Sequence, residues 1–472
     1  MTILVVSFPK LENIDYLLSH HIDRWIIELA DRDALECCAL LENNNIECEY
    51  LPINLIYPFY NDSDTQKEEI SNAIEKINPN LIIACIPYLC EGPSFAAMIA
   101  FFRFYKQYTS LNAEICAVGN FPHVFHDYLI HSGYSFAGTY SELYVFINAH
   151  YKKKIVSFSC VPDYQKLIPY IEQITFKNIG KINLYLRSSI GCPNRCVFCS
   201  TSSSEKSIKY VPLELLENEL QAILNLFGNN KVSFDCIAND SFGINWENDY
   251  QYICLLIKYH VCVKYVLMRA DTIISIKNYL SEIKKVSEFV LIGVENCEDT
   301  ILQASKKNET FLQMIEAIVL LKKNKIKTHL NWIIGLPGET VLSVYHNLKT
   351  MIFLLRSGLA DEIEPQLLTP FPWTPLANER EKYSLFITSN DPYDFNESGI
   401  KACFHYFSST SSLFEKSFLI ARYVCCSFSE KRWDVNRQSS LLNLSKEEIV
   451  TRIYDTYDDN DYKLFLQLIG EK

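Results

Sequence analysis

A nine-residue segment, residues 191–199 with the sequence GCPNRCVFC, limits what this chain can fold into more than any other feature. Its cysteines, Cys192, Cys196 and Cys199, have the spacing C-x3-C-x2-C, and no fourth cysteine follows nearby. Iron–sulfur cubes are held by cysteine thiolates, usually four of them. Three thiolates on one short loop therefore indicate a [4Fe–4S] cluster with one iron left open to another ligand.

Two other uses of these cysteines remain as alternatives. Structural zinc prefers four closed ligands, normally as two spaced pairs. His123, His126 and His131 lie well upstream in a differently patterned segment, so a Cys3His site would be strained. A disulfide framework needs an oxidising compartment, and the first residues do not have the pattern of a secretory signal.

The amino-acid composition limits the cellular compartment and the kinds of partner that we expect for this chain. The 17 cysteines are scattered singly or as adjacent pairs, which favours buried free thiols in a reducing cytoplasm. The longest apolar stretches, such as residues 95–102, fall short of the ~20 residues of a membrane span, so we expect no membrane segment. A net charge of −12 disfavours a nucleic-acid partner, because such partners select a basic surface.

Residues 1–150 alternate between short apolar runs and helical patterns. This alternation predicts a Rossmann-like, doubly wound parallel sheet. Strands are expected at residues 2–8, 46–51, 81–86 and 114–118, and helices at residues 22–41 and 94–105. Residues 151–180, of mixed polar and apolar character, are expected to form a linker.

Residues 181–380 repeat the alternation, so the whole chain is predicted to be α/β. Strands are expected at residues 181–186, 231–237, 265–269, 288–294, 328–334 and 364–368, with helices at 213–226 and around 311–319. Six βα units predict a partial TIM-like barrel, a (β/α)6 fold. Chemistry in such barrels lies at the carboxyl ends of the strands, where the cysteine loop falls. Residues 381–472 are expected to form a small, mostly helical, substrate-associated region.

The cysteine spacing resembles the signature of the radical S-adenosylmethionine (SAM) superfamily, and Phe198 before the third cysteine fits that pattern. Later strand ends extend the resemblance over roughly residues 180–380. Residues 239–242 resemble a DDxF segment, 269–271 an R-A-D segment and 293–296 a GxES segment. Residues 335–340 match a GLPGET turn, and 370–376 resemble PxPGTPL. Each motif alone is weak evidence for the family, but a chance match of all of them in the family's order is not expected.

The resemblance implies a set of cofactor-binding residues beside the three cysteine ligands. They are Phe198, Asn239, Asp240, Arg269, Glu295 and Gly335. It implies that Arg269 pairs with the SAM carboxylate, that Glu295 accepts from amine or ribose donors, and that Gly335 allows close backbone approach. It also implies that the reduced cluster passes an electron to SAM, and that the resulting 5′-deoxyadenosyl radical abstracts hydrogen from a C–H bond. A flavodoxin or ferredoxin would supply the electron.

The N-terminal region resembles the cobalamin-binding domain that precedes the core in one radical SAM subclass. Residues 79–83 resemble its PDLV strand, 118–123 its GGPH turn and 138–142 its GEGE segment. Asn120 replaces the second glycine of the turn, and no Asp-x-His-x-x-Gly follows the first strand. Cobalamin binding is therefore left open, and the alternative is a degenerate domain that serves as a scaffold.

The fate of the substrate after hydrogen abstraction divides the hypotheses. The first is a peptidyl epimerase of the polytheonamide-maturase type, which inverts Cα of a ribosomal precursor peptide from L to D. Cys403 is its candidate hydrogen donor, against the alternative of a small buried hydrophobe. The second hypothesis is a cobalamin-dependent radical SAM methyltransferase. The third is a non-enzymatic iron–sulfur or zinc scaffold, which would not cleave SAM.

Overall fold

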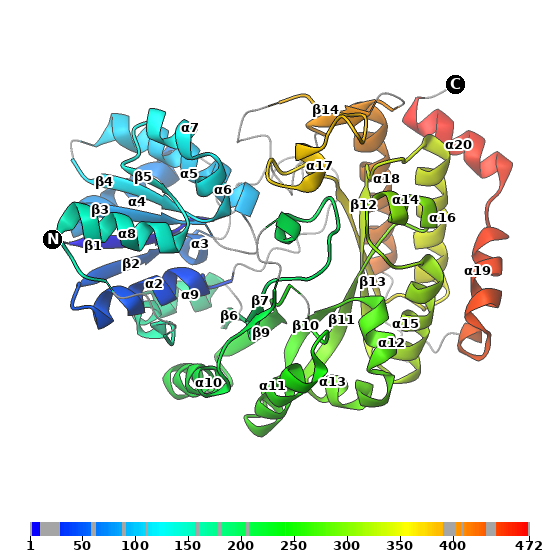
Figure 1. The fold of residues 1–472 in the computed structure, drawn as a ribbon, viewed down its shortest axis with the longest axis horizontal. Helices are drawn as coiled ribbons and strands as arrows, with labels where there is room; N and C mark the ends of the chain where they lie inside the picture. The colour runs from blue at the N-terminus through cyan, green and yellow to red at the C-terminus, as the bar shows by residue number, and fades with distance from the viewer. Residues whose placement is uncertain are drawn as a thin grey trace.

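Two parallel sheets lie side by side in the computed structural model, and helices flank both of them (Figure 1). The structure describes residues 2–9, 29–57, 63–86, 91–109, 112–155, 160–177, 181–203, 207–240, 242–389, 402–406, 409–430 and 440–470. The first sheet has five strands and the second has six. The predicted combination of a Rossmann-like sheet with a partial TIM-like barrel is confirmed.

The N-terminal sheet has the strand order β2-β1-β3-β4-β5, with every neighbouring pair parallel. Its strands are β1 (Ile3–Ser7), β2 (Cys48–Pro52), β3 (Leu81–Cys85), β4 (Glu114–Val118) and β5 (Phe136–Gly138). Alternate residues of β1 belong to different hydrophobic cores. Ile3 and Val5 belong to the core on one face of the sheet, and Leu4 and Val6 belong to the core on the other face. Burial on both faces explains why these strands are continuous apolar runs in the sequence.

Helices cover both faces of this sheet. Residues of α2 (Arg32–Asn43) and α8 (Tyr140–Tyr151) belong to the core on one face. Residues of α4 (Asp64–Ile77) and α5 (Glu91–Tyr108) belong to the core on the other. The short helices are α3 (Ile53–Ile56), α6 (Asn120–Val124) and α7 (His126–His131).

The first predicted helix begins later than expected. Residues 22–28 of the predicted range lie outside the described residues, and residues 29–31 are not helical. The side chain of Asp31 accepts hydrogen bonds from the backbone nitrogens of Asp33 and Ala34, so it caps the helix that starts at Arg32. The helical spacing of apolar residues extends to both sides of Asp31. That spacing alone therefore placed the start of the helix too early, because it does not reveal the capping residue.

The second sheet forms the half-barrel, with the order β13-β12-β11-β10-β9-β6 and all pairs parallel. Its strands are β6 (Ile182–Leu186), β9 (Val232–Ile237), β10 (Val263–Met268), β11 (Ser287–Glu295), β12 (Lys327–Ile334) and β13 (Glu362–Leu367). All six predicted strands are confirmed, with their ends displaced by at most two residues. The structure therefore contains the partial barrel that the alternation predicted.

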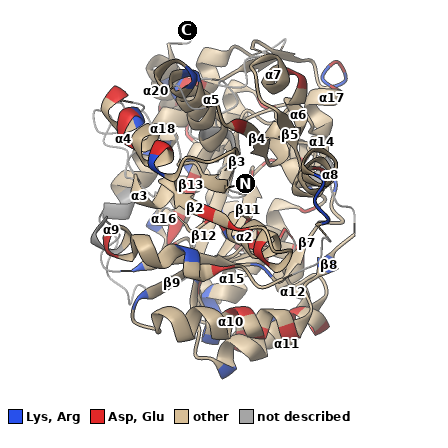
Figure 2. Ribbon diagram, turned by 90° about the vertical axis from the view of Figure 1, so that its left-hand side faces the viewer, with Lys and Arg blue, Asp and Glu red and all other residues tan. Residues whose placement is uncertain are grey.

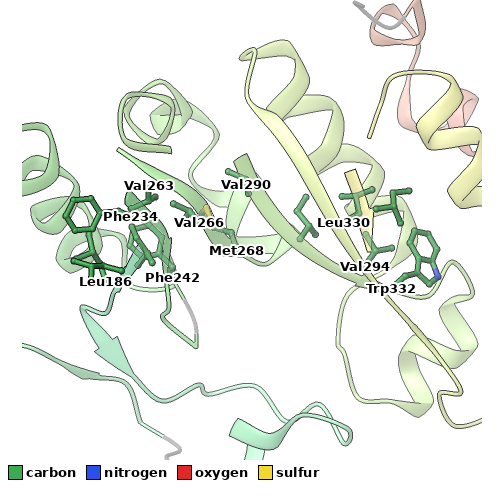
Figure 3. Packing of buried hydrophobic residues seen from close by; sticks show 14 of the residues in the cluster. Leu186, Phe234, Phe242, Val263, Val266, Met268, Val290, Val294, Leu330 and Trp332 are labelled. Atoms are coloured by element: carbon green, nitrogen blue, oxygen red, sulfur yellow. The ribbon is translucent and has the colours of Figure 1, made fainter. Parts of the chain in front are cut away.

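Helices on the outer face of the half-barrel bury the apolar side of the strands. They are α10 (Leu213–Phe227), α11 (Trp246–Lys258), α12 (Ala270–Ser275), α13 (Leu280–Val286), α14 (Asp299–Ala304), α15 (Phe311–Lys323) and α16 (Val341–Arg356). Figure 3 shows Val266, Val290 and Leu330 of successive strands as parts of one continuous cluster. Trp332 is fully buried in the same cluster. This core makes the strand ends a rigid platform for the site.

The C-terminal region packs against the half-barrel. It contains α17 (Pro375–Asn378), an antiparallel pair β14 (Leu385–Ile387) and β15 (Phe404–Tyr406), and helices α18 (Ser411–Glu430), α19 (Lys446–Tyr454) and α20 (Asp459–Ile469). Helix α18 lies against β13 and α16. The predicted linker includes a 3-10 helix (Tyr164–Tyr170) and α9 (Ile171–Lys177). The proposed divisions at residues 150, 180 and 380 stay predictions.

The two domains contact each other through aromatic and charged side chains of their helices and loops. The ring of Phe121 lies edge-on to Trp373, with 4.8 Å between centroids. The guanidinium of Arg32 donates to both carboxylate oxygens of Glu219, at 2.9 and 2.8 Å. Acidic and basic residues are interspersed over many helices and strands of both domains (Figure 2). Among the described residues, no helix has the length and apolar character to cross a bilayer.

Candidate active site

The cysteine loop lies at the carboxyl edge of the half-barrel, between the two-residue strands β7 (Ser189–Ile190) and β8 (Lys209–Tyr210). Backbone hydrogen bonds hold its middle from two sides. Val197 N donates to Ser305 O at 3.0 Å, and Val197 O accepts from Leu376 N at 2.9 Å. The end of α14 and helix α17 therefore hold Val197, which lies between the second and third cysteines, from two sides.

The residues that follow β9 hold the beginning of the same loop. Asn239 Oδ1 accepts from the backbone nitrogens of Ser188 and Ser189, at 2.9 and 3.1 Å. Asp240 Oδ2 accepts from Gly191 N at 2.7 Å, and its Oδ1 accepts from Thr201 Oγ1 at 3.2 Å. The Asn-Asp pair, predicted to bind cofactor, thus has a visible role in shaping the cysteine loop.

The donor set fits an iron–sulfur cluster. Cys192, Cys196 and Cys199 form no disulfide; Cys196 is buried, and the other two are half-buried. Burial raises the pKa of Cys196 to about 11, against the opposing charges of Lys307 and Arg269. A bound metal would stabilise the thiolate form that this burial disfavours. Three thiolates on this loop would hold such a cluster, and Cys199 also lines a cavity.

The zinc alternative has less in its favour. Among the described residues, no three His, Cys, Asp or Glu side chains, the three cysteines included, are placed to hold one metal ion. A cube differs from zinc in this respect, because each thiolate binds a different iron. His123 bonds to Glu142 at 3.0 Å, and His126 bonds to Asp127 at 3.1 Å. His131 Nδ1 bonds to the backbone oxygen of Asp127 at 2.6 Å. These histidines are therefore engaged within the N-terminal region.

A cluster of charged side chains lies beside the cysteine loop. Arg269 Nη2 lies 3.0 Å from Asp271 Oδ2 and 3.2 Å from Glu309 Oε2. Lys307 Nζ lies 3.2 Å from Glu295 Oε1 and 3.5 Å from Glu309 Oε2. Burial opposes the charge of Lys307, but the nearby carboxylates of Glu295 and Glu309 raise its pKa. Burial raises the pKa of Glu295, against the opposing charge of Lys307.

A cavity of about 620 Å³ joins the cysteine loop to the N-terminal domain. The half-barrel contributes charged residues near the loop and an apolar surface that includes Leu267, Met268 and Leu291. The N-terminal sheet and its loops contribute Asp33, Ile86, Gly119, Asn120, Thr139 and Tyr140. A ligand in this cavity would therefore contact both domains.

The structure brings half of the predicted site residues to this cavity. Those that line it are Cys199, Asn239, Asp240, Arg269 and Glu295. The other half, Cys192, Cys196, Phe198, Gly335 and Cys403, are not among the described residues of its wall. Phe198 is half-buried and packs against the main core. Its predicted cofactor contact, like the other assigned roles, stays a prediction.

Gly335 lies in the predicted turn after β12 and has a φ of +103°. A Cβ atom there would come within 2.5 Å of the Phe404 ring. Its backbone oxygen accepts from Tyr406 Oη at 2.8 Å, and its backbone nitrogen donates to Glu339. Burial raises the pKa of Glu339 to about 7, although hydrogen bonds from Gly335 N and from other amide groups favour its charged form. The glycine therefore allows β15 to approach the turn closely.

Cys403 is buried among apolar residues that include Phe371 and the core around α5. Its backbone oxygen accepts from Thr388 N at 2.8 Å. This environment suits a small hydrophobic side chain. Its role as a hydrogen donor stays a prediction.

Sequence reasoning missed several charged residues of the site. Arg187 directly follows β6 and pairs with Asp33 across the two domains. Lys307 and Glu309 lie in the polar connection between α14 and α15. A signal existed for Arg187, since a charged residue at the carboxyl end of a barrel strand is a functional candidate. Lys307 was not singled out in the sequence, and the fold places it on the wall of the cavity.

Comparison with known proteins identifies the class. Residues 186–349 match the family model of the radical SAM superfamily. The chain therefore contains a radical SAM domain, and that family uses a [4Fe–4S] cluster and SAM. Over 169 residues it is 23% identical to the ribosomal protein uS12 methylthiotransferase RimO of Carboxydothermus hydrogenoformans. That match covers 34% of this chain and 38% of RimO.

Solved structures share the two-domain fold. TsrM from Kitasatospora setae, a radical SAM methyltransferase solved with tryptophan substrate and a SAM analogue, has a TM-score of 0.60 at 13% identity. The match covers 96% of this chain and 99% of TsrM. OxsB, a cobalamin-dependent SAM radical enzyme solved with aqua-cobalamin and SAM, has a TM-score of 0.57 at 15% identity. That match covers 81% of this chain but only 56% of OxsB.

Proposed function

We propose that this enzyme removes a hydrogen atom from a C–H bond of a substrate held in the cavity between its two sheets. The observation that carries the proposal is that Cys199 and Tyr140, from different domains, line the same cavity. When bound, the cluster and SAM supply the 5′-deoxyadenosyl radical that takes the hydrogen. The apolar wall around Leu267 and Leu291 excludes water from the reacting groups.

The chain's own residues bind and orient the reactants. Asn239 and Asp240 hold the cysteine loop in shape through its backbone amides. Arg269 and Glu295 place opposite charges on the cavity wall beside that loop. Charged groups of both signs suit the amino-acid end of SAM. We expect a flavodoxin or ferredoxin in a reducing cytoplasm to deliver the electron.

The finer proposal is L-to-D epimerisation at Cα of a ribosomal precursor peptide. Asn120 replaces a glycine of the cobalamin-domain turn and lines the cavity, which supports a domain adapted to contact substrate. Epimerisation also requires a hydrogen donor on the second face of the peptide. Cys403 remains the proposed donor, and the peptide would have to reach it beside Phe371.

Methyl transfer with cobalamin is the second candidate, and the position of the cavity favours it. In the order β2-β1-β3-β4-β5, the direction of winding reverses between β1 and β3. Open α/β sheets bind ligands beyond the carboxyl ends of the strands at such a switch point. Ile86 follows β3, Asp33 lies in the first turn of α2, and both line the cavity. Cobalamin held there would face the cysteine loop.

One anaerobic experiment distinguishes these functions. The reconstituted enzyme is incubated in D2O with SAM, dithionite and the peptide encoded beside its gene, with and without added cobalamin. Epimerisation predicts a peptide that is heavier by a single deuterium and contains a D-residue, whether or not cobalamin is present. Methyl transfer predicts a peptide that is heavier by a methyl group only when cobalamin is present.

The matched control is the Cys199→Ala variant under the same conditions, which should give neither product. If the wild-type enzyme forms 5′-deoxyadenosine but leaves the peptide unchanged, the proposal that the substrate is a peptide is contradicted. The proposal of hydrogen abstraction is not contradicted by that result. If Cys403→Ala still forms the deuterated D-residue at the wild-type rate, Cys403 is not the donor.

A further inference from the structure

The cysteine loop has an inner side, toward the cavity, and an outer side. Cys199 lines the cavity, whereas Cys192 and Cys196 are not among the described residues of its wall. Between those two cysteines, Pro193 and Arg195 are exposed to solvent. Electron tunnelling slows steeply with distance, so an electron donor has to come close to the cluster ligands. With the reactants in the cavity, such a donor can approach on the outer side of the loop.

Two segments that are distant in the sequence lie against this loop. Val197 N donates to Ser305 O at 3.0 Å, which holds the connection between α14 and α15 beside the loop. Val197 O accepts from Leu376 N at 2.9 Å, which holds α17 beside it as well. Figure 2 shows α17, α14 and β8 along the same side of the molecule. These segments and the cysteine loop therefore form one surface.

Exposed basic side chains outnumber exposed acidic ones on this surface. In the cysteine loop, β8, residues 305–310 and residues 375–384, the exposed basic residues are Arg195, Lys209, Lys306, Arg380 and Lys382. The exposed acidic residues of the same segments are Glu379 and Glu381. The whole chain has a net charge of −12, so an excess of positive charge at the cysteine loop runs against its composition.

The two sides of this surface meet at Glu379. Lys382 Nζ, from the turn after α17, lies 2.6 Å from Glu379 Oε2. The hydrogen bond from Lys382 and the charge of Lys306 both lower the pKa of Glu379. Lys306 belongs to the other segment, so the lysines of both segments lie around one carboxylate. That carboxylate offsets only part of their charge.

We propose that the loop-side basic surface, formed by Arg195, Lys209, Lys306, Arg380 and Lys382, docks a small acidic electron-carrier protein. The reduced carrier gives one electron to the cluster and is itself oxidised by one electron, and docking forms and breaks no covalent bond. Opposite charges on two proteins steer their encounter and raise its rate. Electron-transfer encounters bury small interfaces, so a few charges around the loop are sufficient. The proposal rests on the radical SAM function and does not depend on the substrate.

Charge reversal outside the cysteine loop tests this surface. Lys306→Glu and Arg380→Glu are combined in one variant, and the matched control combines Lys463→Glu with Arg452→Glu. Lys463 and Arg452 are exposed on α20 and α19, and both pairs change the net charge equally. The probe is a purified, fluorescently labelled flavodoxin with an acidic surface. Its dissociation constant with each reconstituted enzyme is measured by fluorescence anisotropy at low and at high ionic strength.

We expect the Lys306→Glu/Arg380→Glu variant to bind flavodoxin about tenfold more weakly than wild type at low ionic strength. The difference should nearly vanish at about 0.5 M salt, because salt screens exposed charges. The control should bind like wild type, and a Lys306→Gln/Arg380→Gln variant should be intermediate. In stopped-flow mixing, reduced flavodoxin should bleach the visible absorption of the cluster more slowly in the charge-reversed variant by a similar factor. Bleaching by dithionite should change much less, because dithionite needs no docked protein.

Equal affinities of the two double variants for flavodoxin at low ionic strength would overturn the proposal. An equal loss of reduction rate with flavodoxin and with dithionite would also overturn it, because the effect would then lie in the cluster itself. Weaker binding of the precursor peptide, with unchanged flavodoxin binding, would assign the surface to the substrate instead. Wild-type enzyme that flavodoxin reduces as expected but that forms no 5′-deoxyadenosine would support the docking surface and contradict the proposed function.

Discussion

The carboxylate of Asp240 lies 2.7 Å from the backbone nitrogen of Gly191, so the end of β9 is joined to the first residue of the cysteine loop. The other oxygen of Asp240 accepts from Thr201 Oγ1 at 3.2 Å, on the far side of the three cysteines. A single carboxylate thus bridges the two ends of the segment that carries the proposed cluster ligands. Loop shape, and with it the spacing of the thiolates, depends on this bridge.

Replacement of Asp240 by alanine should therefore reduce cluster retention. Hydrogen bonds to a charged group contribute about 1.5–3 kcal/mol each, and their loss leaves the Gly191 amide without this acceptor. We expect iron and sulfide content after anaerobic reconstitution to fall several-fold, with Asp240→Asn intermediate because its amide oxygen can still accept. Glu247→Gln, an exposed carboxylate on α11, is the control. Equal iron content in Asp240→Ala and the control would show that the bridge is dispensable.

Two glycines of one turn provide a matched test of how β15 packs on the half-barrel. Gly335 and Gly338 both have positive φ, +103° and +90°. A Cβ on Gly335 would meet the Phe404 ring, whereas a Cβ on Gly338 would meet nothing within 4 Å. Strained backbone alone costs about 1–3 kcal/mol. Gly335→Ala should therefore lower the melting temperature further than Gly338→Ala does.

The contribution of the ring can be isolated with a third variant. Phe404→Leu should restore part of the stability lost in Gly335→Ala, because it removes the clashing ring edge. If thermal denaturation gives the same melting temperature for both glycine variants, β15 does not approach Gly335 as the structure shows.

Stability should depend on pH through Asp249 in the first turn of α11. Burial raises the pKa of Asp249 to about 7 from 3.8, against a hydrogen bond from Gly243 N at 2.8 Å. Between these values the folded protein keeps a proton that the unfolded chain releases, so stability falls as pH rises through this window. Asp249→Asn, which mimics the protonated form, should be more stable than wild type at pH 8 by roughly 2–4 kcal/mol.

Urea unfolding at pH 4 and at pH 8 checks this prediction. The two proteins should differ little at pH 4 and most at pH 8, since wild-type Asp249 is ionised in both states only at the higher pH. Glu247→Gln on the same helix is the control, because it removes an exposed carboxylate two residues away. A constant difference across the pH range would mean that Asp249 is ionised in the fold throughout.

The sequence predicted the fold well because its two sheets are parallel and buried. Such strands are continuous apolar runs, and β6, β9 and β12 were located from that pattern alone. The beginning of α2 was predicted too early. The helical spacing of apolar residues continues on both sides of the capping residue Asp31, so that spacing does not mark where the helix starts. Periodicity identifies the interior of an element better than its ends.

The site was predicted only as far as local motifs extend. The cysteine spacing and Arg269 are local patterns, and both lie at the cavity or beside it. The contact of Arg187 with Asp33 joins segments far apart in the chain, so no local pattern encodes it. The contact of Lys307 with Glu295 depends on how the connection between α14 and α15 returns to the end of β11. The position of Cys403 also depends on tertiary packing, which places it in a core cluster that includes Phe371 rather than in the described cavity wall.

The most direct measurement of the central claim is 5′-deoxyadenosine formation by anaerobically reconstituted enzyme with SAM and dithionite. Wild type should contain about four irons per chain and release methionine and 5′-deoxyadenosine. Replacement of Cys192, Cys196 or Cys199 by alanine should remove the cluster and this activity together. Wild-type protein that binds no iron, or cysteine variants that cleave SAM at the wild-type rate, would contradict the account.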